Sequence, residues 1–277
     1  MTFLAACVQM RSGIDRRANV AAASRLIEEA ARRGAAFVST PEMTNVLDRS
    51  AERLFAHLDV ETSAPEVGEF AALARRLKIF LLIGSMAVRT EAKRAANRSF
   101  LFAPDGTLAA RYDKIHRFDV DLPNGESWRE SNVFDAGAEA IVAKTPLAAF
   151  GLTVCYDLRF PHLYRAMARA GADVLCAPAA FTKQTGEAHW HALLKARAIE
   201  NGAFVIAAAQ GGVHEDGRAT FGHSLIIGPW GECLAEADSA EPGVILAEID
   251  PARARDARAR IPNLALENEI GVRVVGP

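Results

Sequence analysis

Cys155 and Glu42 have side chains that could react, and each lies at the carboxyl end of a predicted apolar strand. Cys155 closes the apolar run of residues 152–155, and a helix is predicted from Pro161. A strand-to-helix turn of this kind presents the nucleophile in α/β folds, and a helix N-terminus favours the reactive thiolate. Glu42 follows the predicted strand 37–39, where a carboxylate is well placed for a crevice at the end of a sheet. The two positions predict a thiol nucleophile and an acid–base partner.

Two further charged residues, Lys114 and Glu130, belong to a polar stretch at residues 114–132. Lys114 lies just after the predicted strand 108–112 and begins the stretch, and Glu130 lies near the end of the stretch. A structureless loop of about nineteen residues inside a compact domain is usually functional. A structural alternative remains open for each candidate, because cysteine is often a small buried hydrophobe and charged residues are mostly exposed.

Apolar runs alternate with amphipathic segments along the chain, which predicts an α/β domain with helices covering the sheet faces. Asp15 is expected to cap the first helix, and Pro65 to open the second. Helices are predicted at residues 15–33, from 65, at 161–169, at 187–201 and from 251, and the main strands at 3–9, 37–39, 79–85, 99–103, 108–112, 152–155, 173–177, 204–209, 221–227 and 244–249. Neither a linker nor a repeat divides the chain, so we predict one domain over residues 1–277.

The overall composition is that of an ordinary globular protein. Of the 277 residues, 50% are apolar and 24% are charged, with a net charge of -2. No global field attracts nucleic acid or an anionic membrane, and no apolar run is long enough to span a bilayer. The four cysteines match no CxxC or zinc spacing, so we predict neither a disulfide framework nor a metal, in a reducing, cytoplasmic setting.

Other motifs are weaker. His189 and His191 are two residues apart on a predicted helix, which points them to different faces and argues against a metal site. The segment at residues 222–226 lacks the last glycine of a serine-nucleophile elbow. The basic run at residues 252–260 is expected to be a solvated helix face, because no aromatic residue interleaves with it.

Three segments occur in order along the chain: Thr40-Pro-Glu-Met, Arg111-Tyr-Asp-Lys-Ile-His-Arg-Phe-Asp and Cys155-Tyr-Asp-Leu-Arg-Phe-Pro. Together they resemble the nitrilase superfamily of carbon–nitrogen hydrolases, and the resemblance covers nearly the whole chain. Further segments resemble its Nit-type amidases: Thr185-Gly-Glu-Ala-His-Trp, Ala196-Arg-Ala-Ile-Glu, Gly222-His-Ser and Pro229-Trp-Gly. Residues 207–214 are most similar to the deaminated-glutathione amidase branch.

The resemblance implies a four-layer α-β-β-α sandwich and a Glu-Lys-Cys triad, carried here by Glu42, Lys114 and Cys155. It also implies a second glutamate between the lysine and the cysteine. Glu130 matches that motif, and Glu126 is the competing candidate. The family also implies a homodimer or a higher homo-oligomer, with the C-terminal segment from about residue 251 at a subunit interface.

Amide hydrolysis by such a triad has defined chemical needs. A free thiol is only a few per cent ionised at pH 7, so Glu42 is expected to accept the proton of Cys155 and return it to the leaving group. Lys114 and the backbone N–H of Tyr156 are expected to stabilise the oxyanion. The predicted reaction converts the terminal carboxamide of a small carboxylic acid to the acid and ammonia through a thioester, with water as co-substrate and no cofactor.

The substrate-binding residues are predicted to be Arg159, Phe181 and Thr185. Arg159 could bind a substrate carboxylate bidentately, although a structural arginine is the alternative. Phe181 and Thr185 match segments that line the pocket in similar amidases. Deaminated glutathione is the favoured substrate. The alternatives are an ω-amidase acting on α-ketoglutaramate, an N-carbamoyl-type amidohydrolase, and, in another class, a non-catalytic binding protein with the same fold.

Overall fold

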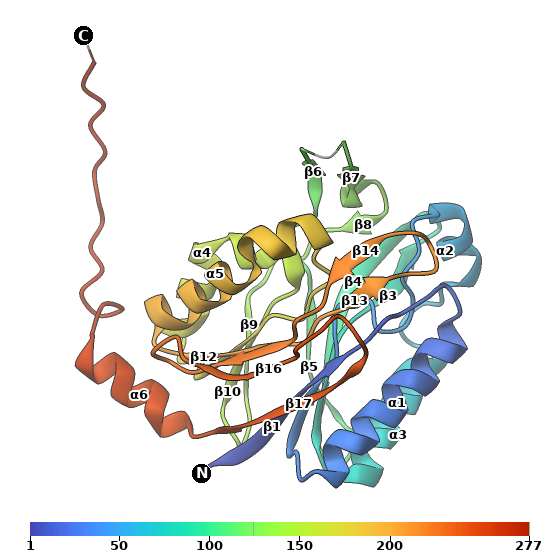
Figure 1. Cartoon of the computed structure of the whole chain (residues 1–277), viewed down its shortest axis with the longest axis horizontal. Helices are drawn as coiled ribbons and strands as arrows, with labels where there is room; N and C mark the ends of the chain where they lie inside the picture. Colours follow the sequence, from blue (N-terminus) through green and yellow to red (C-terminus); the bar gives the residue numbers. More distant parts are fainter. Residues whose placement is uncertain (124, 277) are drawn as a thin grey trace.

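The computed structural model describes residues 1–123 and 125–276, and its framework is two β-sheets packed face to face (Figure 1). In the first sheet the strand order is β17-β1-β2-β3-β4-β5, and β8 pairs with β4. Its strands are β1 (Phe3–Gln9), β2 (Phe37–Ser39), β3 (Phe80–Glu91), β4 (Arg94–Phe102), β5 (Leu108–Asp113), β8 (Phe134–Asp135) and β17 (Gly243–Ile249). β1, β2 and β3 are parallel, so their carboxyl ends share one edge.

The second sheet has the order β16-β15-β12-β11-β10-β9. Its strands are β9 (Ile141–Lys144), β10 (Ala149–Leu152), β11 (Val174–Cys176), β12 (Phe204–Ala207), β15 (Leu225–Ile227) and β16 (Cys233–Glu236). Two small ladders stand apart: β6 (Asp119–Asp121) with β7 (Ser127–Arg129), and β13 (Gly211–Val213) with β14 (Ala219–Phe221). β10, β11 and β12 are again parallel, so each sheet has a parallel centre.

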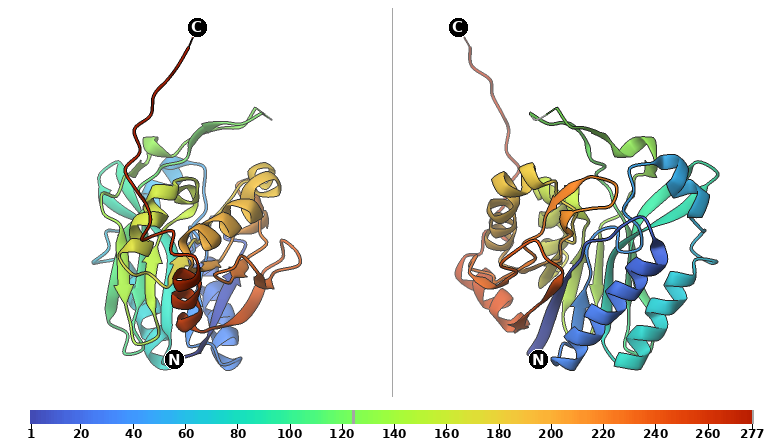
Figure 2. Two further views of the ribbon diagram at one scale, coloured as in Figure 1. Left: turned by 90° about the vertical axis from the view of Figure 1, so that its left-hand side faces the viewer. Right: turned by 45° about the vertical axis from the view of Figure 1, so that its right-hand side comes forward.

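Helices form the two outer layers. α1 (Arg16–Arg32) and α3 (Pro65–Leu77) cover the first sheet, and α4 (Pro161–Arg169) and α5 (Lys183–Asn201) cover the second (Figure 2). The remaining helical segments are α2 (Ala51–His57), α6 (Pro251–Arg260) and the short 3-10 turns Glu130–Asn132 and Cys155–Arg159. The predicted α-β-β-α sandwich is therefore confirmed.

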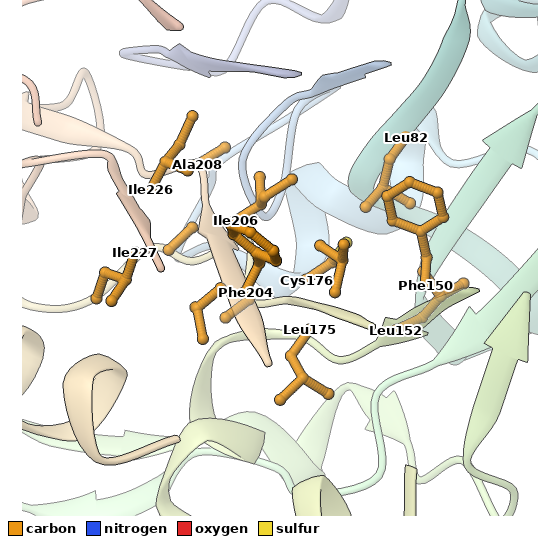
Figure 3. Packing of buried hydrophobic residues seen from close by; sticks show 14 of the residues in the cluster. Leu82, Phe150, Leu152, Leu175, Cys176, Phe204, Ile206, Ala208, Ile226 and Ile227 are labelled. Carbon is orange, nitrogen blue, oxygen red and sulfur yellow. The ribbon is translucent and has the colours of Figure 1, made fainter. Parts of the chain in front are cut away.

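The interior between the sheets is filled by apolar side chains from both of them (Figure 3). Phe37 of β2 stacks on Phe150 of β10, with ring centroids 4.3 Å apart and planes 5° from parallel. Central strands such as β11 are buried along their whole length, as their uninterrupted apolar sequences predict. This packing fixes the two sheets relative to each other, and with them the loops at their edges.

α1 and α3 form where the sequence predicts them because their N-terminal signals and apolar faces agree. Asp15 accepts hydrogen bonds from the backbone N–H groups of Arg17 and Ala18, and Pro65 opens α3. A second apolar cluster, which includes Ile27 of α1 and Phe70 of α3, joins this layer to the first sheet.

Several elements differ from those that the local sequence pattern predicts. The stretch at residues 114–132 is not structureless, because it folds into the β6–β7 hairpin and a 3-10 turn. α5 begins at Lys183 rather than residue 187, with Thr182 capping its first turn. The predicted strand 221–227 is interrupted, since Gly222 and His223 have φ values of 74° and 53° and separate β14 from β15. α2 has no counterpart in the prediction.

The C-terminal region has two parts. α6 packs on the body through the buried Ala254 and Ala257, and Arg258 donates to the backbone oxygen of Asn201. The basic run is thus only partly solvated. Beyond the helix, the segment before residue 277 extends away from the body (Figure 2) and exposes apolar side chains such as Ile270 and Val272. Among the residues described, no helix is long and apolar enough to cross a membrane.

Candidate active site

A cavity of about 430 Å³ opens at the edge where the carboxyl ends of both sheets meet. Strands of the two sheets deliver side chains to it, as expected for α/β folds. All the sequence-predicted site residues line this cavity: Glu42, Lys114, Glu130, Cys155, Tyr156, Arg159, Phe181 and Thr185. Segments separated by more than 140 residues in the chain therefore converge on one site.

Cys155 occupies a sharp turn three residues after β10. Its φ is +50°, a left-handed value that is uncommon for a residue with a Cβ and is often found at functional sites. The backbone N–H of Cys155 donates to the oxygen of Pro178 at 2.8 Å, which fixes the turn to the segment after β11. Cys155 itself is 7% exposed, so the thiol reaches the cavity but little else.

The buried carboxylate of Asp157 holds this turn in place. Asp157 accepts hydrogen bonds from the backbone N–H of Val154 at 2.9 Å and from the Tyr112 hydroxyl at 2.6 Å. It also accepts from the backbone N–H of His116 at 3.0 Å, and its Oδ1 lies 2.7 Å from Nδ1 of the same residue. Asp157 therefore ties the turn that bears Cys155 to the strand that delivers Lys114.

Glu42 is positioned by close packing of its loop against β3. Gly84 of β3 has no room for a side chain, because a Cβ there would lie 2.1 Å from the backbone oxygen of Thr40 and 2.6 Å from that of Pro41. Met43, the next residue, has a φ of 55°. The resulting bend turns the Glu42 carboxylate into the cavity, where Glu42 is only 5% exposed.

Lys114 lies between two carboxylates. Its Nζ is 2.8 Å from Oε1 of Glu42 and 2.8 Å from Oε2 of Glu130. Asn97 donates to both acids as well, at 2.9 Å to Glu42 and 3.1 Å to Glu130. The second oxygen of Glu42 accepts from the backbone N–H of Ala180 at 2.9 Å. Donors thus lie between the two acids and hold them in place.

These contacts set the protonation states. Burial raises the pKa of Glu42, but the Lys114 ammonium and hydrogen bonds from Lys114, Cys155 and Asn97 outweigh it, so the pKa lies below its ordinary value. Burial lowers the pKa of Lys114, whereas the Glu130 and Glu42 charges raise it well above its ordinary value. Burial and the Glu42 charge raise the pKa of Cys155 well above its usual range. Cys155 therefore rests as a protonated thiol near the Glu42 carboxylate, not as the thiolate expected from the helix N-terminus.

The structure separates the two candidates for the second glutamate. Glu130 starts the 3-10 turn after β7, contacts Lys114, and accepts from the backbone N–H of Phe118 at 2.6 Å. Glu126 accepts from the indole N–H of Trp128 at 3.3 Å and is not among the cavity-lining residues. Only Glu130 of the two contacts the ammonium group.

The predicted substrate-binding residues form one wall of the cavity. The guanidinium of Arg159 lies 5.2 Å from the Phe181 ring and 5.9 Å from the Tyr156 ring. Burial lowers the pKa of Arg159, and its contacts within residues 1–123 and 125–276 are with His189 and two aromatic rings rather than with a carboxylate. Thr185 lies in the first turn of α5 and shares a hydrogen bond of 2.8 Å with Thr182. Among the described residues, this wall therefore offers an arginine that contacts His189 but is not paired with a carboxylate.

Two further arginines, Arg49 and Arg218, line the same cavity, and Arg218 is paired with Asp216 at 3.1 Å. The guanidinium carbons of Arg49 and Arg218 lie 4.5 and 4.7 Å from the centroid of the Trp128 ring. All three residues line the cavity. The combination suits an anionic substrate, because charge-assisted hydrogen bonds to carboxylates are strong where water is excluded.

Comparison with known proteins agrees with this geometry. Residues 4–259 match the carbon-nitrogen hydrolase family. The chain belongs to that family. A deaminated glutathione amidase from Synechocystis sp. (strain PCC 6803 / GT-S) is 42% identical to this hydrolase over 266 residues, which are 95% of this chain and 97% of the relative.

Two solved structures are similar to this hydrolase over most of its length. Nit3 of Saccharomyces cerevisiae, described as a member of the nitrilase superfamily, is 28% identical with a TM-score of 0.84, covering 94% of each chain. An amidase from Nesterenkonia sp. AN1 is 25% identical with a TM-score of 0.78, covering 94% of this hydrolase and 98% of that chain; its structure shows acrylamide added to the active-site cysteine. The predicted membership of the nitrilase superfamily is confirmed.

Several residues that shape the site of this hydrolase were missed by sequence reasoning. Asp157 belongs to the quoted Cys155 segment, so its position near the candidate nucleophile was available as a signal. Asn97 and the Arg49–Trp128–Arg218 stack gave no local signal, because their partners come from distant parts of the chain.

Proposed function

We propose that this hydrolase cleaves the amide bond of a small carboxylate-bearing amide, with Cys155 as nucleophile, Glu42 as general base and acid, and Lys114 as oxyanion stabiliser. One observation carries the proposal: the Glu42 carboxylate accepts from the Lys114 ammonium at 2.8 Å, and both line the same cavity as the Cys155 thiol. Such an array supplies a base and a positive charge to one reacting carbonyl.

In the first half-reaction the thiol proton passes to Glu42 while the Cys155 sulfur bonds to the carbonyl carbon. The oxyanion is stabilised by the Lys114 ammonium and the Tyr156 backbone N–H. When the tetrahedral intermediate collapses, the carbon–nitrogen bond breaks, and the proton on Glu42 transfers to the departing amine. The product that remains is a thioester on Cys155.

In the second half-reaction a water molecule attacks the thioester and gives its proton to Glu42. Collapse breaks the carbon–sulfur bond, the acid leaves, and the proton returns to Cys155. Glu130 holds Lys114 through contacts of 2.8 and 3.0 Å, so we assign it the role of keeping the ammonium oriented and charged.

Deaminated glutathione is the proposed substrate. Relatives from Synechocystis sp. and Homo sapiens carry the name deaminated glutathione amidase. Glutathione has a γ-amide to the cysteinyl nitrogen and no primary carboxamide. The leaving group from this substrate is therefore the amine of cysteinylglycine and not the ammonia expected from the sequence, which only a primary amide such as α-ketoglutaramate releases. Arg159 and the Arg49–Trp128–Arg218 stack are proposed to bind its carboxylates.

We further propose that the protein is a homodimer or a higher homo-oligomer, and that the segment from residue 251 contributes to the interface. The exposed apolar side chains of Ile270, Val272 and Val274 support this assembly. A cytoplasmic location is proposed because the nucleophilic thiol must stay reduced. Light scattering coupled to size exclusion tests the assembly, and a monomeric mass contradicts it.

The decisive experiment measures acid and amine release from a panel of deaminated glutathione, α-ketoglutaramate, glutamine, asparagine and a simple nitrile. Turnover of deaminated glutathione is expected to exceed the others and to fall by about 10⁴-fold or more in Cys155→Ala. The matched control is Cys7→Ala, which removes a thiol buried in β1 outside the cavity. Equal turnover in Cys155→Ala and in the parent chain refutes the nucleophile, and turnover of another panel member alone refutes the substrate.

A further inference from the structure

Outside the cavity, three potential metal ligands meet between α5 and the edge of the second sheet. They are His191 of α5, His223 between β14 and β15, and Glu236 of β16, and their ligand atoms all lie within 4.8 Å of one another. Nε2 of His191 is 2.7 Å from Oε1 of Glu236, and Nδ1 of His223 is 3.5 Å from the same oxygen. Figure 1 labels α5 and β16, and it labels β14, which ends two residues before His223.

The backbone around the cluster is held firmly. His223 adopts a φ of 53°, and its backbone oxygen accepts from the Trp190 indole N–H at 2.8 Å. The Phe221 ring stacks on the His223 ring with centroids 4.4 Å apart and meets the His191 ring edge-on at 5.9 Å. Two imidazoles are thus oriented around one carboxylate by contacts that need no metal.

We propose that His191, His223 and Glu236 bind a divalent transition metal of the zinc type, with the fourth position open to water. Two imidazoles and one carboxylate are a donor set that zinc sites use, and zinc–ligand distances near 2.0–2.2 Å place tetrahedral ligand atoms about 3.4 Å apart. The separations around Glu236 bracket that value, so small side-chain rotations suffice to close the site. The side chains of all three residues are 27–38% exposed, which leaves the metal an entry path.

In the sequence, His189 and His191 form the pair whose spacing predicts that no metal binds. In the structure that pair does diverge, since His189 contacts Arg159 at 3.3 Å while His191 contacts Glu236. The partners of His191 come from residues 32 and 45 positions later in the chain, which the local spacing could not reveal.

Two thiols could bind zinc independently of the histidine cluster. The thiol of Cys233 lies 3.9 Å from the second oxygen of Glu236, and the catalytic-site thiol of Cys155 adjoins Glu42. Either thiol could capture zinc by itself. Binding is therefore measured in a Cys155→Ala background, with Cys233→Ser added in a parallel chain.

Titration calorimetry with Zn²⁺ is expected to give one-to-one binding in the Cys155→Ala chain. His191→Gln and His223→Asn should each weaken it by about tenfold or more, because each removes a direct ligand. Asparagine is chosen at position 223 because it tolerates a positive φ. His57→Gln, which changes an exposed histidine at the end of α2, should bind like the parent.

Thermal unfolding of the same chains provides a second readout. Zn²⁺ should raise the Tm of the parent and of His57→Gln but not that of His191→Gln, and the metal-free Tm values show whether each variant folds. Cys233→Ser should retain binding within about threefold, less than the loss of a direct ligand causes. If the Cys155→Ala chain does not bind Zn²⁺ one-to-one, the proposal is overturned. Loss of binding in Cys233→Ser while both histidine variants retain it also overturns the proposal.

Discussion

Nζ of Lys114 lies 2.8 Å from Oε1 of Glu42, in a site where the two side chains are only 2% and 6% exposed. A buried ion pair of this kind leaves a costly uncompensated charge when one partner is lost. The same contact lowers the pKa of Glu42 and raises that of Lys114, so it fixes both charges. The proposed base and the proposed oxyanion donor therefore depend on each other.

Replacing the proposed base separates hydrolysis from thiol reactivity. Glu42→Gln should lower kcat for amide hydrolysis by about 10²–10⁴-fold, because the proton acceptor is gone. The Glu42 charge raises the pKa of Cys155, so its removal should lower that pKa and speed alkylation by iodoacetamide at pH 7. Steady-state rates and mass-spectrometric labelling measure the two effects. Glu139→Gln, at an exposed loop position, is the matched control, and unchanged hydrolysis in Glu42→Gln contradicts the role.

The two glutamates in the polar stretch can be distinguished by the same conservative change. Glu130→Gln should reduce kcat by about tenfold or more, because it removes one of the two charges that orient Lys114. Glu126→Gln should change kcat by no more than about twofold, because the contact of Glu126 with Trp128 lies away from the Lys114 ammonium. Initial-rate kinetics decide the matter, and a larger loss in Glu126→Gln reverses the assignment.

The pKa shifts of Glu42, Cys155 and Lys114 predict that kcat/KM stays constant over a broad range of pH. Glu42 must be ionised, and its pKa lies below its ordinary value of 4.5. On the acid side, kcat/KM should therefore decrease only below pH 4.5. Cys155 must carry its proton and Lys114 its charge, and their pKa values lie well above 9.0 and 10.5. Activity should therefore stay level from pH 5 to pH 9. A limb near neutrality in the kcat/KM profile contradicts the protonated resting thiol.

Arg159 should act on binding more than on chemistry. Arg159→Gln is expected to raise KM for a carboxylate-bearing amide by about 10- to 100-fold with a small change in kcat, because a hydrogen bond to a charged group contributes about 1.5–3 kcal/mol. Arg169→Gln on the outer face of α4 serves as the control. An equal rise in KM for an amide that lacks a carboxylate shows that the effect is not charge recognition.

Gly84 should be intolerant of alanine because its Cβ would collide with the loop that presents Glu42. Gly84→Ala is expected to destabilise the fold by about 1–3 kcal/mol and to lower activity as the loop shifts. Gly68→Ala, in α3 with nothing within 4 Å of the added methyl, should instead stabilise by about 0.5–1 kcal/mol. Urea unfolding measures both values, and equal stability of the two variants refutes the packing argument.

Much of this protein could be predicted from its sequence. Strand and helix periodicity, the Asp15 cap and Pro65 located the main elements, and the motifs around Glu42, Lys114 and Cys155 predicted the family and the four-layer fold. These features are written in residues close together in the chain, where backbone preferences and short motifs act. The site roles of those residues remain predictions until the variants are measured.

Only the tertiary structure decided which distant groups meet. Asn97 and Ala180 complete the surroundings of Glu42, Glu130 rather than Glu126 contacts Lys114, and His191 faces Glu236. The protonated state of Cys155 also follows from burial and from the Glu42 charge, both of which outweigh a local helix effect. Contacts and desolvation depend on how two sheets pack, and that packing sums many weak interactions across the chain rather than residing in any one segment.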